Sequence, residues 1–472
     1  MSILSKSPAQ SRIVRLLLEM RASWRLALPI MLGQLASVGM GVLDTVLAGR
    51  HGQTTLAAVA IGSAVWSIVL LVLIGVLMAV PPAVSQLNGA RRRAEIGAVF
   101  RQALWLALAL GLGLLVLVHV GSNWLLTAMR IPSAVQYGAL AFLHAIAWGS
   151  PAIALYLCCR YLSEGVAWSP PTMLFGCAGL LLLLPLGYAL MFGAWGLPEL
   201  GAAGLGWATT IILWLQTAAF ALYLRYASRY ADLQLFARID PPRRAPIAEL
   251  LRVGLPMGIA VFFEGALFVA TALVIGRLGT LPIAAHQIAI SLATVAFMLP
   301  LGAAMATTVR VGHAAGAGDA SGVRRAAGAG YAIVLITQTC SAALMLFCAG
   351  WLARLYTSDP AVIALATSLL AYAAAFQYPD GIQALSNGVL RGLKDTRAPM
   401  AITLIAYWCI GMPLGSWLGL SLGWGPRGMW WGLIVGLATA ALLLAARVRR
   451  MTRHDVRRMP MVETAAIDPG QM

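Results

Sequence analysis

The chain has 472 residues, of which 60% are apolar before its 48 glycines are counted, and only 10% carry a charge. Soluble domains contain about 45–50% apolar residues with glycine included, so this composition excludes an ordinary water-soluble fold. The formal net charge is +17, but the basic residues are dispersed in short patches between long apolar runs. These runs are long enough for bilayer-spanning helices and do not alternate as barrel strands do, which predicts an all-α polytopic membrane protein.

Twelve membrane-spanning helices are predicted along the chain. Several exceed the minimum spanning length, which leaves room for tilt or for extensions beyond the bilayer. In chain order, the expected spans are 23–49, 57–88, 97–127, 133–159, 172–193, 202–225, 251–276, 284–312, 324–351, 361–390, 398–420 and 428–447.

The distribution of basic residues between these helices predicts the orientation of the protein. If the N-terminus is cytoplasmic, 28 of the 33 Lys and Arg residues fall on the cytoplasmic side. The five on the other side are Arg50, Arg130, Arg277, Arg354 and Arg427. This bias obeys the positive-inside rule with both termini in the cytoplasm. It accounts for the net charge through membrane topology and contacts with lipid headgroups, so we expect no nucleic-acid partner.

The sequence repeats itself at an offset of 227 residues. Pro29 falls on Pro256, and the pair Gly49-Arg50 falls on the pair Gly276-Arg277. The first half contains six predicted spans, an even number, so both halves insert in the same sense. This is the pattern of a parallel repeat with a pseudo-twofold axis along the membrane normal, an architecture suited to alternating access.

The expected domain organisation follows from the repeat. A cytoplasmic N-terminal segment precedes a six-helix N-terminal lobe, a cytoplasmic linker joins this lobe to a six-helix C-terminal lobe, and a cytoplasmic tail ends the chain. The expected bounds of these five parts are 1–22, 23–225, 226–250, 251–447 and 448–472.

Three of the 16 acidic residues lie inside predicted spans, whereas the other thirteen fall in loops, at helix ends or in the tails. The three are Asp44 in the first span, Glu264 in the seventh and Asp380 in the tenth. An ionisable group at the centre of a bilayer costs about 2.5–3.5 kcal/mol and usually marks an ion or proton path. The alternative is a carboxylate held by neighbouring hydroxyl groups.

Asp380 directly follows Pro379 in the stretch AAFQYPDGIQALSNG. No Lys or Arg is expected at membrane depth near the three acids, so their counter-charge is a proton, a metal cation or a cationic substrate. We interpret Asp380 as a cation-binding group. A proline at this position lets the helix bend or offers a free carbonyl, although an ordinary kink is the simpler explanation for Pro379 alone.

The chain resembles the multidrug and toxic compound extrusion (MATE) transporters, in particular their NorM-like branch, over about residues 20–450. The motifs of the first half are LPIMLGQL, VLDTVLAGR, LAAVAIGSAVW and PPAVSQLNGA. Those of the second half are LPMGIAVFFE, AAHQIAI, FMLPLGAAMATTVRVGHAAGAG and SNGVLRGLKDTRAPM. The resemblance implies twelve helices in two lobes and export of organic cations in exchange for Na⁺ or H⁺.

The resemblance also implies site residues. Asp44, Glu264 and Asp380 match the family's acids in the first, seventh and tenth helices, and the last two imply a cation site in the C-terminal lobe, which is a metal site if the ion is Na⁺. Phe376 stands where many members have a tyrosine, which removes a hydroxyl ligand. His286, in the motif AAHQIAI, is interpreted as a helix-end hydrogen bonder rather than as a proton relay.

The N-terminal lobe departs from the family pattern. Leu183 and Gly187 stand where many members carry two asparagines near the first-helix acid, while the proline between them is retained as Pro185. Thr209 or Thr210 could still supply a hydroxyl there. We therefore assign ion coupling to the C-terminal lobe, and the participation of Asp44 stays open.

Together these features predict a monomeric secondary antiporter of the bacterial inner membrane, which exports cationic amphiphilic compounds in exchange for Na⁺ or H⁺ by alternating access and uses no cofactor. The alternative is a lipid-linked oligosaccharide flippase of the same superfamily, but this would need a basic cavity for pyrophosphate. A membrane-embedded transferase would need a large loop or an acid-His-Ser constellation, and the short loops favour a protein that is not an enzyme. The coupling ion and the natural substrate stay open.

Overall fold

The computed structural model describes residues 8–238 and 240–454, and no strand occurs in these two ranges. Eleven helices within them are long and apolar enough to cross a membrane. A further pair of helices, bent by 46° at a short break, brings the number to twelve if it forms one span. This pair covers the fourth predicted span, 133–159. The prediction of an all-α polytopic membrane protein with up to twelve spans is confirmed.

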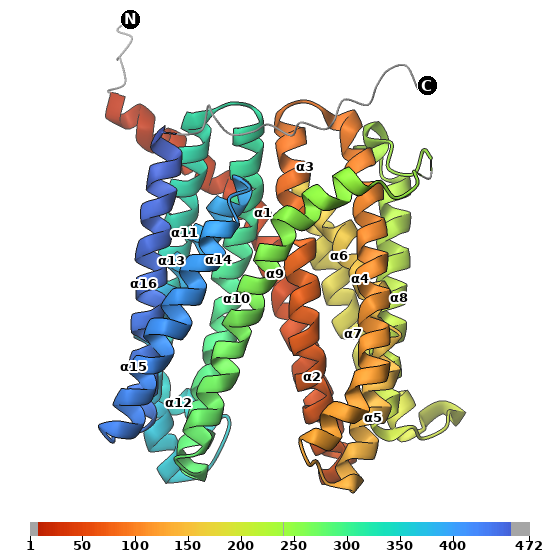
Figure 1. The fold of residues 1–472 in the computed structure, drawn as a ribbon, viewed down its shortest axis with the longest axis vertical. Helices are drawn as coiled ribbons and strands as arrows, with labels where there is room; N and C mark the ends of the chain where they lie inside the picture. Colours follow the sequence, from red (N-terminus) through yellow and green to blue (C-terminus); the bar gives the residue numbers. More distant parts are fainter. Residues whose placement is uncertain (1–7, 239, 455–472) are drawn as a thin grey trace, which may run out of the picture. The chain divides into compact units, whose positions relative to one another are not determined.

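The first half of the chain contains eight α-helices and two short 3₁₀ segments (Figure 1). The bent pair is α5 and α6. The bounds are α1 (Pro8–His51), α2 (Gln53–Leu77), α3 (Val80–Gly89), α4 (Arg93–Ala128), α5 (Ser133–Ala147), α6 (Ser150–Gly165), α7 (Pro170–Phe192), η1 (Ala194–Gly196), α8 (Gly201–Tyr226) and η2 (Ser228–Leu233).

The second half contains eight more α-helices, and two π-helical turns interrupt the eleventh predicted span. The bounds are α9 (Arg244–Gly276), α10 (Thr280–Gly316), α11 (Ala320–Phe347), α12 (Ala349–Arg354), α13 (Pro360–Gly392), α14 (Arg397–Leu404), η3 (Ile405–Gly411), α15 (Met412–Ser416), η4 (Trp417–Ser421) and α16 (Pro426–His454).

The described chain forms two compact units. The C-terminal unit contains the described residues up to Met31 and those from Phe263 onward, and the N-terminal unit contains Leu32–Phe262. Each boundary falls inside a long helix, α1 or α9, so each unit includes the first part of the helix that opens the other half. The predicted lobes were defined differently, as six consecutive helices each, and they stay a prediction. Residues 1–7 and most of the predicted tail lie outside the described residues.

Small residues let these helix segments approach their neighbours closely. In the N-terminal unit, Gly75 of α2 faces the backbone of Gly258 in α9. In the C-terminal unit, Gly302 of α10 faces the backbone of Met31 in α1. The offset of 227 residues relates these two contacts to one another. Membrane helices pack through small residues because lipid tails provide no hydrophobic drive for helix association, so the repeat in the sequence is also a repeat in packing.

Two glycines at equivalent positions of the repeat precede α2 and α10. Gly52 has φ 153° and ψ 164°, and Gly279 has φ 121° and ψ 176°. This region of backbone space is essentially restricted to glycine, because a side chain there clashes with the backbone. Each glycine therefore permits the turn that starts the second helix of its half.

Replacing Gly52 or Gly279 with Ala should lower the free energy of unfolding by about 1–3 kcal/mol, because the new side chain strains the backbone. Crowding does not contribute at Gly52, where nothing lies within 4 Å of an added Cβ. Thermal unfolding in detergent measures the change. Gly276→Ala is the matched control, because this position is also open but lacks the positive φ. Equal melting temperatures for Gly52→Ala and Gly276→Ala would contradict the prediction.

The connection between α8 and α9 is bound to the N-terminal unit by ion pairs. Arg93 donates to Asp232 with an Nε–Oδ2 distance of 2.5 Å, and Arg101 donates to Asp240 with an Nε–Oδ2 distance of 2.6 Å. Both arginines belong to α4. The first pair is largely exposed, whereas the second is buried, with side-chain exposures of 10% and 11%.

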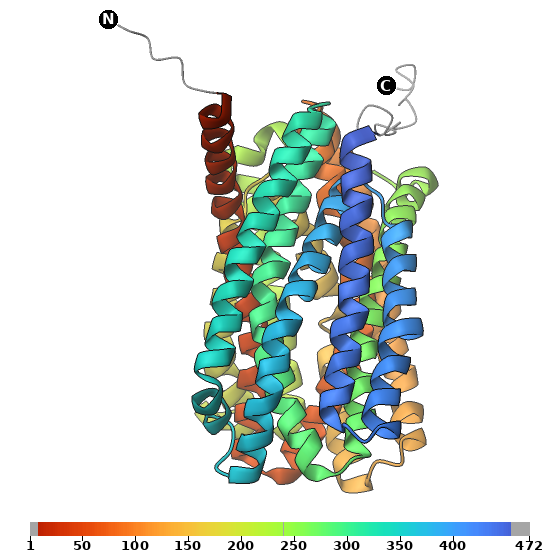
Figure 2. The same ribbon diagram turned by 90° about the vertical axis from the view of Figure 1, so that its left-hand side faces the viewer.

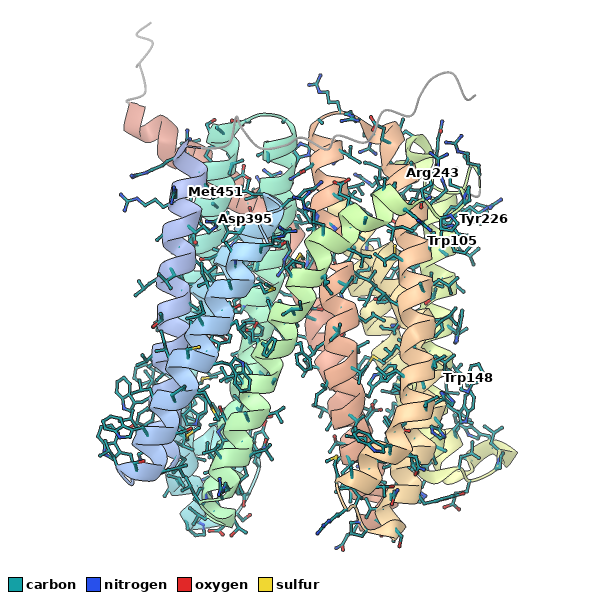
Figure 3. All side chains as sticks on the ribbon, in the orientation of Figure 1. Trp105, Trp148, Tyr226, Arg243, Asp395 and Met451 are labelled. Atoms are coloured by element: carbon teal, nitrogen blue, oxygen red, sulfur yellow. The ribbon has the colours of Figure 1, made fainter. Side chains whose placement is uncertain are left out.

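Backbone groups of the same connection are also hydrogen bonded to α4. Figure 3 shows Trp105 and Arg243 in this region. The indole N–H of Trp105 donates to the carbonyl of Asp240 at 2.8 Å, and the backbone N–H of Arg243 donates to Oε1 of Gln102 at 2.7 Å. The connection that leads into α9 is therefore fixed to α4 rather than loosely tethered.

The ion pair of Asp240 makes this attachment depend on pH. Burial by itself raises the pKa of Asp240, but the hydrogen bond from Arg101 and the charges of Arg101, Arg238 and Arg243 outweigh it and lower that pKa below its usual value of 3.8. A carboxyl group with a lowered pKa in the folded state stabilises the fold above its unfolded pKa. This stabilisation is complete at neutral pH and is lost only as the pH falls through the lowered pKa.

Replacing Asp240 with Asn should loosen the connection at neutral pH, because Arg101 then keeps a buried charge without its carboxylate. Hydrogen–deuterium exchange of residues 228–238 measures the effect, and each loss of about 1.4 kcal/mol speeds exchange roughly tenfold. Asp232→Asn is the matched control with a smaller expected effect, since that carboxylate is 54% exposed. Equal exchange rates in the two variants would show that burial of the Asp240 pair does not hold the connection.

Candidate cation site in the C-terminal unit

Asp380 lies in the middle of α13, a helix that packs against α10, α11 and α16 (Figure 2). This packing leaves Asp380 only 3% exposed. The helix continues through Pro379, which is partly buried. Because proline has no backbone N–H, the carbonyl of Ala375 loses its usual helical hydrogen-bond donor. A carboxylate and a free carbonyl therefore occur within about one turn of the same helix.

Glu264 of α9 belongs to the same compact unit as Asp380. The charges of the two carboxylates act on one another, so the fold brings them within electrostatic reach. The charge of Arg391 acts favourably on Glu264. The expectation that no Lys or Arg lies at membrane depth near the acids stays a prediction, since Arg391 is on the last turn of α13. α13 extends to Gly392, so Arg391 is a helical residue of the unit and not part of a free connection.

Aromatic rings surround the turn that precedes Asp380. Phe376 is 2% exposed, and its ring centroid lies 6.2 Å from that of Phe268 and 5.7 Å from that of Trp430. Both contacts are edge-to-face, the arrangement that aromatic pairs prefer. Phe376 therefore forms an apolar wall beside the carboxylate and contributes no hydroxyl group.

Several buried polar atoms of the C-terminal unit have no hydrogen-bond partner among the described residues. They include the hydroxyl groups of Thr271 and Tyr407, both ring nitrogens of His286, the indole N–H of Trp430 and the side-chain amide of Gln383. Among the described residues, no hydrogen bond reaches the carboxylate of Asp380 or of Glu264. Buried polar groups normally have a partner in the protein or in ordered water. The oxygen atoms among them can bind water or a cation, whereas the N–H groups can only donate to water or another acceptor.

His286 differs from its interpretation as a helix-end hydrogen bonder. It is 1% exposed, and within the described chain neither ring nitrogen has a partner. Its ring lies edge-on to Trp430, with the centroids 5.8 Å apart. The interpretation failed because α10 begins at Thr280, before the predicted start of the span at residue 284. The turn that carries His286 therefore lies inside the helix and is buried in the unit.

Asp44 belongs to α1 within the N-terminal unit and is partly buried, with an Oδ1 atom that has no partner among the described residues. Apolar groups surround the two positions at which many family members carry asparagines. Leu183 is fully buried in a cluster with Ala208 and Ile212. Gly187 lies against Leu47, whose side chain an added Cβ would meet at 3.0 Å.

The two candidate threonines of α8 differ from one another. Thr210 donates to the carbonyl of Ala145 at 2.8 Å, which joins α8 to α5. Thr209 is buried, and within the described residues its hydroxyl has no partner. Of the two, Thr209 therefore retains a hydroxyl that is free to bind an ion or water, whereas Thr210 has a structural hydrogen bond.

A fourth buried acid, Glu164 of α6, was missed by the sequence analysis. It is 1% exposed and accepts hydrogen bonds from Arg160 at 2.8 Å and from Thr172 at 3.0 Å. Arg160 also donates to Gln34 at 2.9 Å. The sequence placed both charges near the end of a span. The i,i+4 spacing in CRYLSE was the available signal, since such pairs meet on a helix face.

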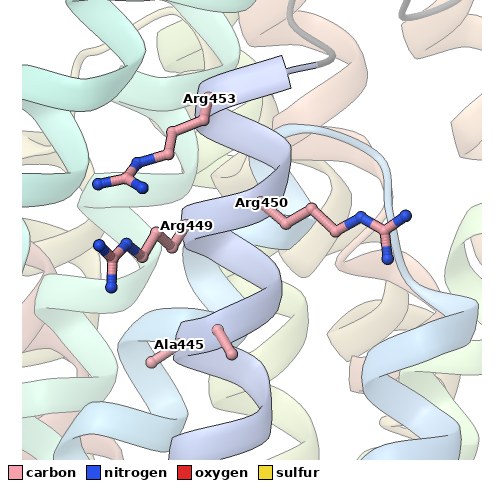
Figure 4. Close-up of a pocket in the computed structure, with 5 residues that line it drawn as sticks. Ala445, Arg449, Arg450 and Arg453 are labelled. Atoms are coloured by element: carbon pink, nitrogen blue, oxygen red, sulfur yellow. The ribbon is translucent and has the colours of Figure 1, made fainter.

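A group of arginines lies on the last turns of α16. Arg449, Arg450 and Arg453 line a shallow groove with Ala445 and Ala446, and Arg450 points away from the other two (Figure 4). The three guanidinium groups are on exposed residues. Exposed basic residues at the end of a membrane helix are typical of contacts with lipid headgroups, so we assign them no part in the cation site.

Two repeated helical units, up to twelve apolar spans, and two acids within one unit, one buried and one partly buried, together define a membrane transporter built from a parallel repeat. The chain belongs to the MATE family: the family model described as MatE matches residues 29–189 and 256–417. The two matched segments begin 227 residues apart, which is the offset found within the sequence.

The chain is similar to bacterial proteins named as multidrug resistance proteins. It is 53% identical over 436 residues to the probable multidrug resistance protein NorM of Xanthomonas axonopodis pv. citri, which covers 92% of this chain and 95% of that protein. It is 43% identical over 452 residues to the multidrug resistance protein PmpM of Pseudomonas aeruginosa, with coverages of 95% and 94%.

Solved structures of MATE transporters share the fold. The eukaryotic MATE transporter AtDTX14 matches with a TM-score of 0.84 and 20% identity, over 94% of this chain and 100% of that chain. An outward-facing multidrug resistance MATE family transporter matches with a TM-score of 0.84 and 20% identity, over 92% and 96%. At this identity the similarity concerns the fold alone.

Proposed function

We propose that the protein is a secondary antiporter that exports cationic amphiphilic compounds in exchange for Na⁺ or H⁺. Asp380 and Glu264 are the coupling carboxylates, Phe376 and Pro379 shape their surroundings, and no organic cofactor takes part. The names of the bacterial relatives support the export of drugs.

The observation that carries this proposal is the pairing of Asp380 and Glu264 within one unit. Two carboxylates in a low-dielectric site repel one another, and a bound cation or proton offsets the repulsion. Arg391 offsets part of the charge of Glu264. Asp380 is therefore the group that most needs a mobile counter-charge, which suits it to bind and release an ion in each cycle.

Coupling requires that the ion and the organic cation favour different conformations of the protein. Ion binding at Asp380 and Glu264 removes the negative charge that attracts an organic cation, so the two cations compete through charge. Asp44 and Thr209 offer a second, weaker polar position in the N-terminal unit. We place the protein in the bacterial inner membrane as a monomer surrounded by lipid, with both termini cytoplasmic.

Purified protein in liposomes tests this proposal. Efflux of ethidium, a fluorescent organic cation, is followed under an imposed Na⁺ gradient or an imposed pH gradient, each applied alone. We expect one of the two gradients to drive efflux, which also identifies the coupling ion. If neither gradient moves an organic cation, the antiporter proposal is wrong, and transport of lipid-linked oligosaccharides becomes the function to test.

A further inference from the structure

Tyr407 is a buried residue with an unused polar group. It is 1% exposed, and its hydroxyl has no hydrogen-bond partner among the described residues. Its ring belongs to a buried apolar cluster that also contains Phe376 and Trp430. An unpaired buried hydroxyl costs roughly 1–3 kcal/mol, so such a group is usually retained for water or a ligand.

The neighbours of Tyr407 place it beside Glu264. The indole N–H of Trp408 donates to the carbonyl of Phe263 at 3.3 Å, and the two rings meet edge-to-face with centroids 6.0 Å apart. Tyr407 precedes Trp408 along the chain, and Phe263 precedes Glu264. The turn that carries Tyr407 therefore packs against the turn of α9 that carries Glu264.

Tyr407 also lies within electrostatic reach of Asp380 on α13. Phe376, one turn before Asp380, lies in the same buried cluster as Tyr407. The charges of Glu264 and of Asp380 both act on the Tyr407 hydroxyl. Three oxygen-bearing side chains from α9, α13 and η3 thus come within electrostatic reach of one another.

The backbone around Tyr407 is irregular and firmly supported. Residues Ile405–Gly411 form a π-helical turn, a feature often found at functional sites. At the end of this turn, an added Cβ on Gly411 would meet the carbonyl of Gly432 and the Cα of Gly436, both at 3.1 Å. The end of the turn therefore packs closely against α16.

We propose that the Tyr407 hydroxyl is a third oxygen of the cation site, beside Asp380 and Glu264. With Na⁺ bound, its oxygen is a neutral ligand of the metal. The hydroxyl that is absent at Phe376 is thus supplied from a different helix. This inference rests on the proposed function, because it assumes that the two carboxylates bind the coupling ion.

Tyr407→Phe tests the inference, since it removes one oxygen and keeps the ring. In the liposome assay, we expect the ion concentration for half-maximal ethidium efflux to change by roughly tenfold, the effect of one lost interaction. At saturating ion, the apparent affinity for ethidium should stay within about twofold. Tyr331→Phe is the matched control, because Tyr331 has a hydrogen bond to Ser386 at 2.7 Å and no place in the site.

The outcomes separate this inference from the proposed function. If Asp380→Asn abolishes ion-driven efflux but Tyr407→Phe keeps the ion dependence of the native protein, Tyr407 is not part of the site and the antiporter proposal stands. If Asp380→Asn behaves like the native protein, the proposed function fails, and the inference fails with it. A Tyr331→Phe change as large as that of Tyr407→Phe also overturns the inference, since any lost hydroxyl would then produce it.

If Tyr407→Phe folds poorly, a second measurement tests the inference in a protein that keeps the Tyr407 hydroxyl. 3-Fluorotyrosine at position 407 reports on its hydroxyl through the ¹⁹F resonance. We expect titration with the coupling ion to shift this resonance in the otherwise native protein and not in the Asp380→Asn background. A resonance that ignores the ion in the native background rules out direct participation of Tyr407.

Discussion

Replacing Asp380 with Asn should reduce ion-driven efflux of ethidium from liposomes by at least roughly tenfold. The amide keeps the size of the side chain but removes the charge that binds a cation, and each 1.4 kcal/mol of lost binding lowers affinity about tenfold. Burial enlarges the effect, because Asp380 is 3% exposed and water screens it poorly. The loss should persist when the ion gradient is made steeper.

Asp359→Asn provides the matched control on the same helix. Asp359 is exposed and caps α13 by accepting a hydrogen bond from the backbone N–H of Ala361 at 2.8 Å. Asparagine caps a helix about as well as aspartate, so this variant makes the same chemical change without harm to the helix. Equal efflux rates for Asp380→Asn, Asp359→Asn and the native protein would rule out Asp380 as the coupling residue.

Breaking the buried ion pair of Arg160 and Glu164 should give the largest loss of stability. Glu164→Leu leaves the Arg160 guanidinium buried, with an exposure of 6%, and without its carboxylate. Removal of one partner from a buried pair costs about 3–5 kcal/mol. Denaturant unfolding in mild detergent, followed by tryptophan fluorescence, measures the free energy of unfolding.

Two comparisons separate burial from the general effect of losing an acid. Glu95→Leu removes a carboxylate whose pair with Arg92 is partly exposed, at 37% and 34%, so it should cost less than about 1 kcal/mol. The double change Arg160→Met with Glu164→Leu should regain much of the stability, because apolar residues can replace a buried ion pair. If the free energy of unfolding of Glu164→Leu is no lower than that of Glu95→Leu, the Arg160–Glu164 pair is not important for folding.

Local patterns in the sequence were sufficient to predict the fold class. Apolar runs of helical length define spans independently of their neighbours, because each helix satisfies its own backbone hydrogen bonds in lipid. The fourth span was predicted as one helix, and its bend between α5 and α6 was not visible in hydropathy. The repeat was found because prolines and Gly-Arg pairs recur in register, and Gly52 and Gly279 share the same rare backbone conformation.

The composition of the candidate site was only partly predictable. Asp380, Glu264 and Asp44 were found because an acid inside an apolar run is conspicuous. Glu164 and Tyr407 were missed, since one lies near the end of a predicted span and the other is an ordinary residue of a membrane helix. Hydropathy cannot distinguish the inward face of a helix whose surface is apolar on all sides.

By itself, the sequence determined that this is a membrane protein, that its helices divide into two repeated halves, and that three acids lie inside apolar runs. Only the tertiary structure decided that Glu264 and Asp380 come within electrostatic reach of one another, and that the Tyr407 hydroxyl has no partner among the described residues. The physical reason is that each span is set by the local transfer of its residues into lipid. Which side chains come near one another depends instead on close packing between helices that are far apart in the chain.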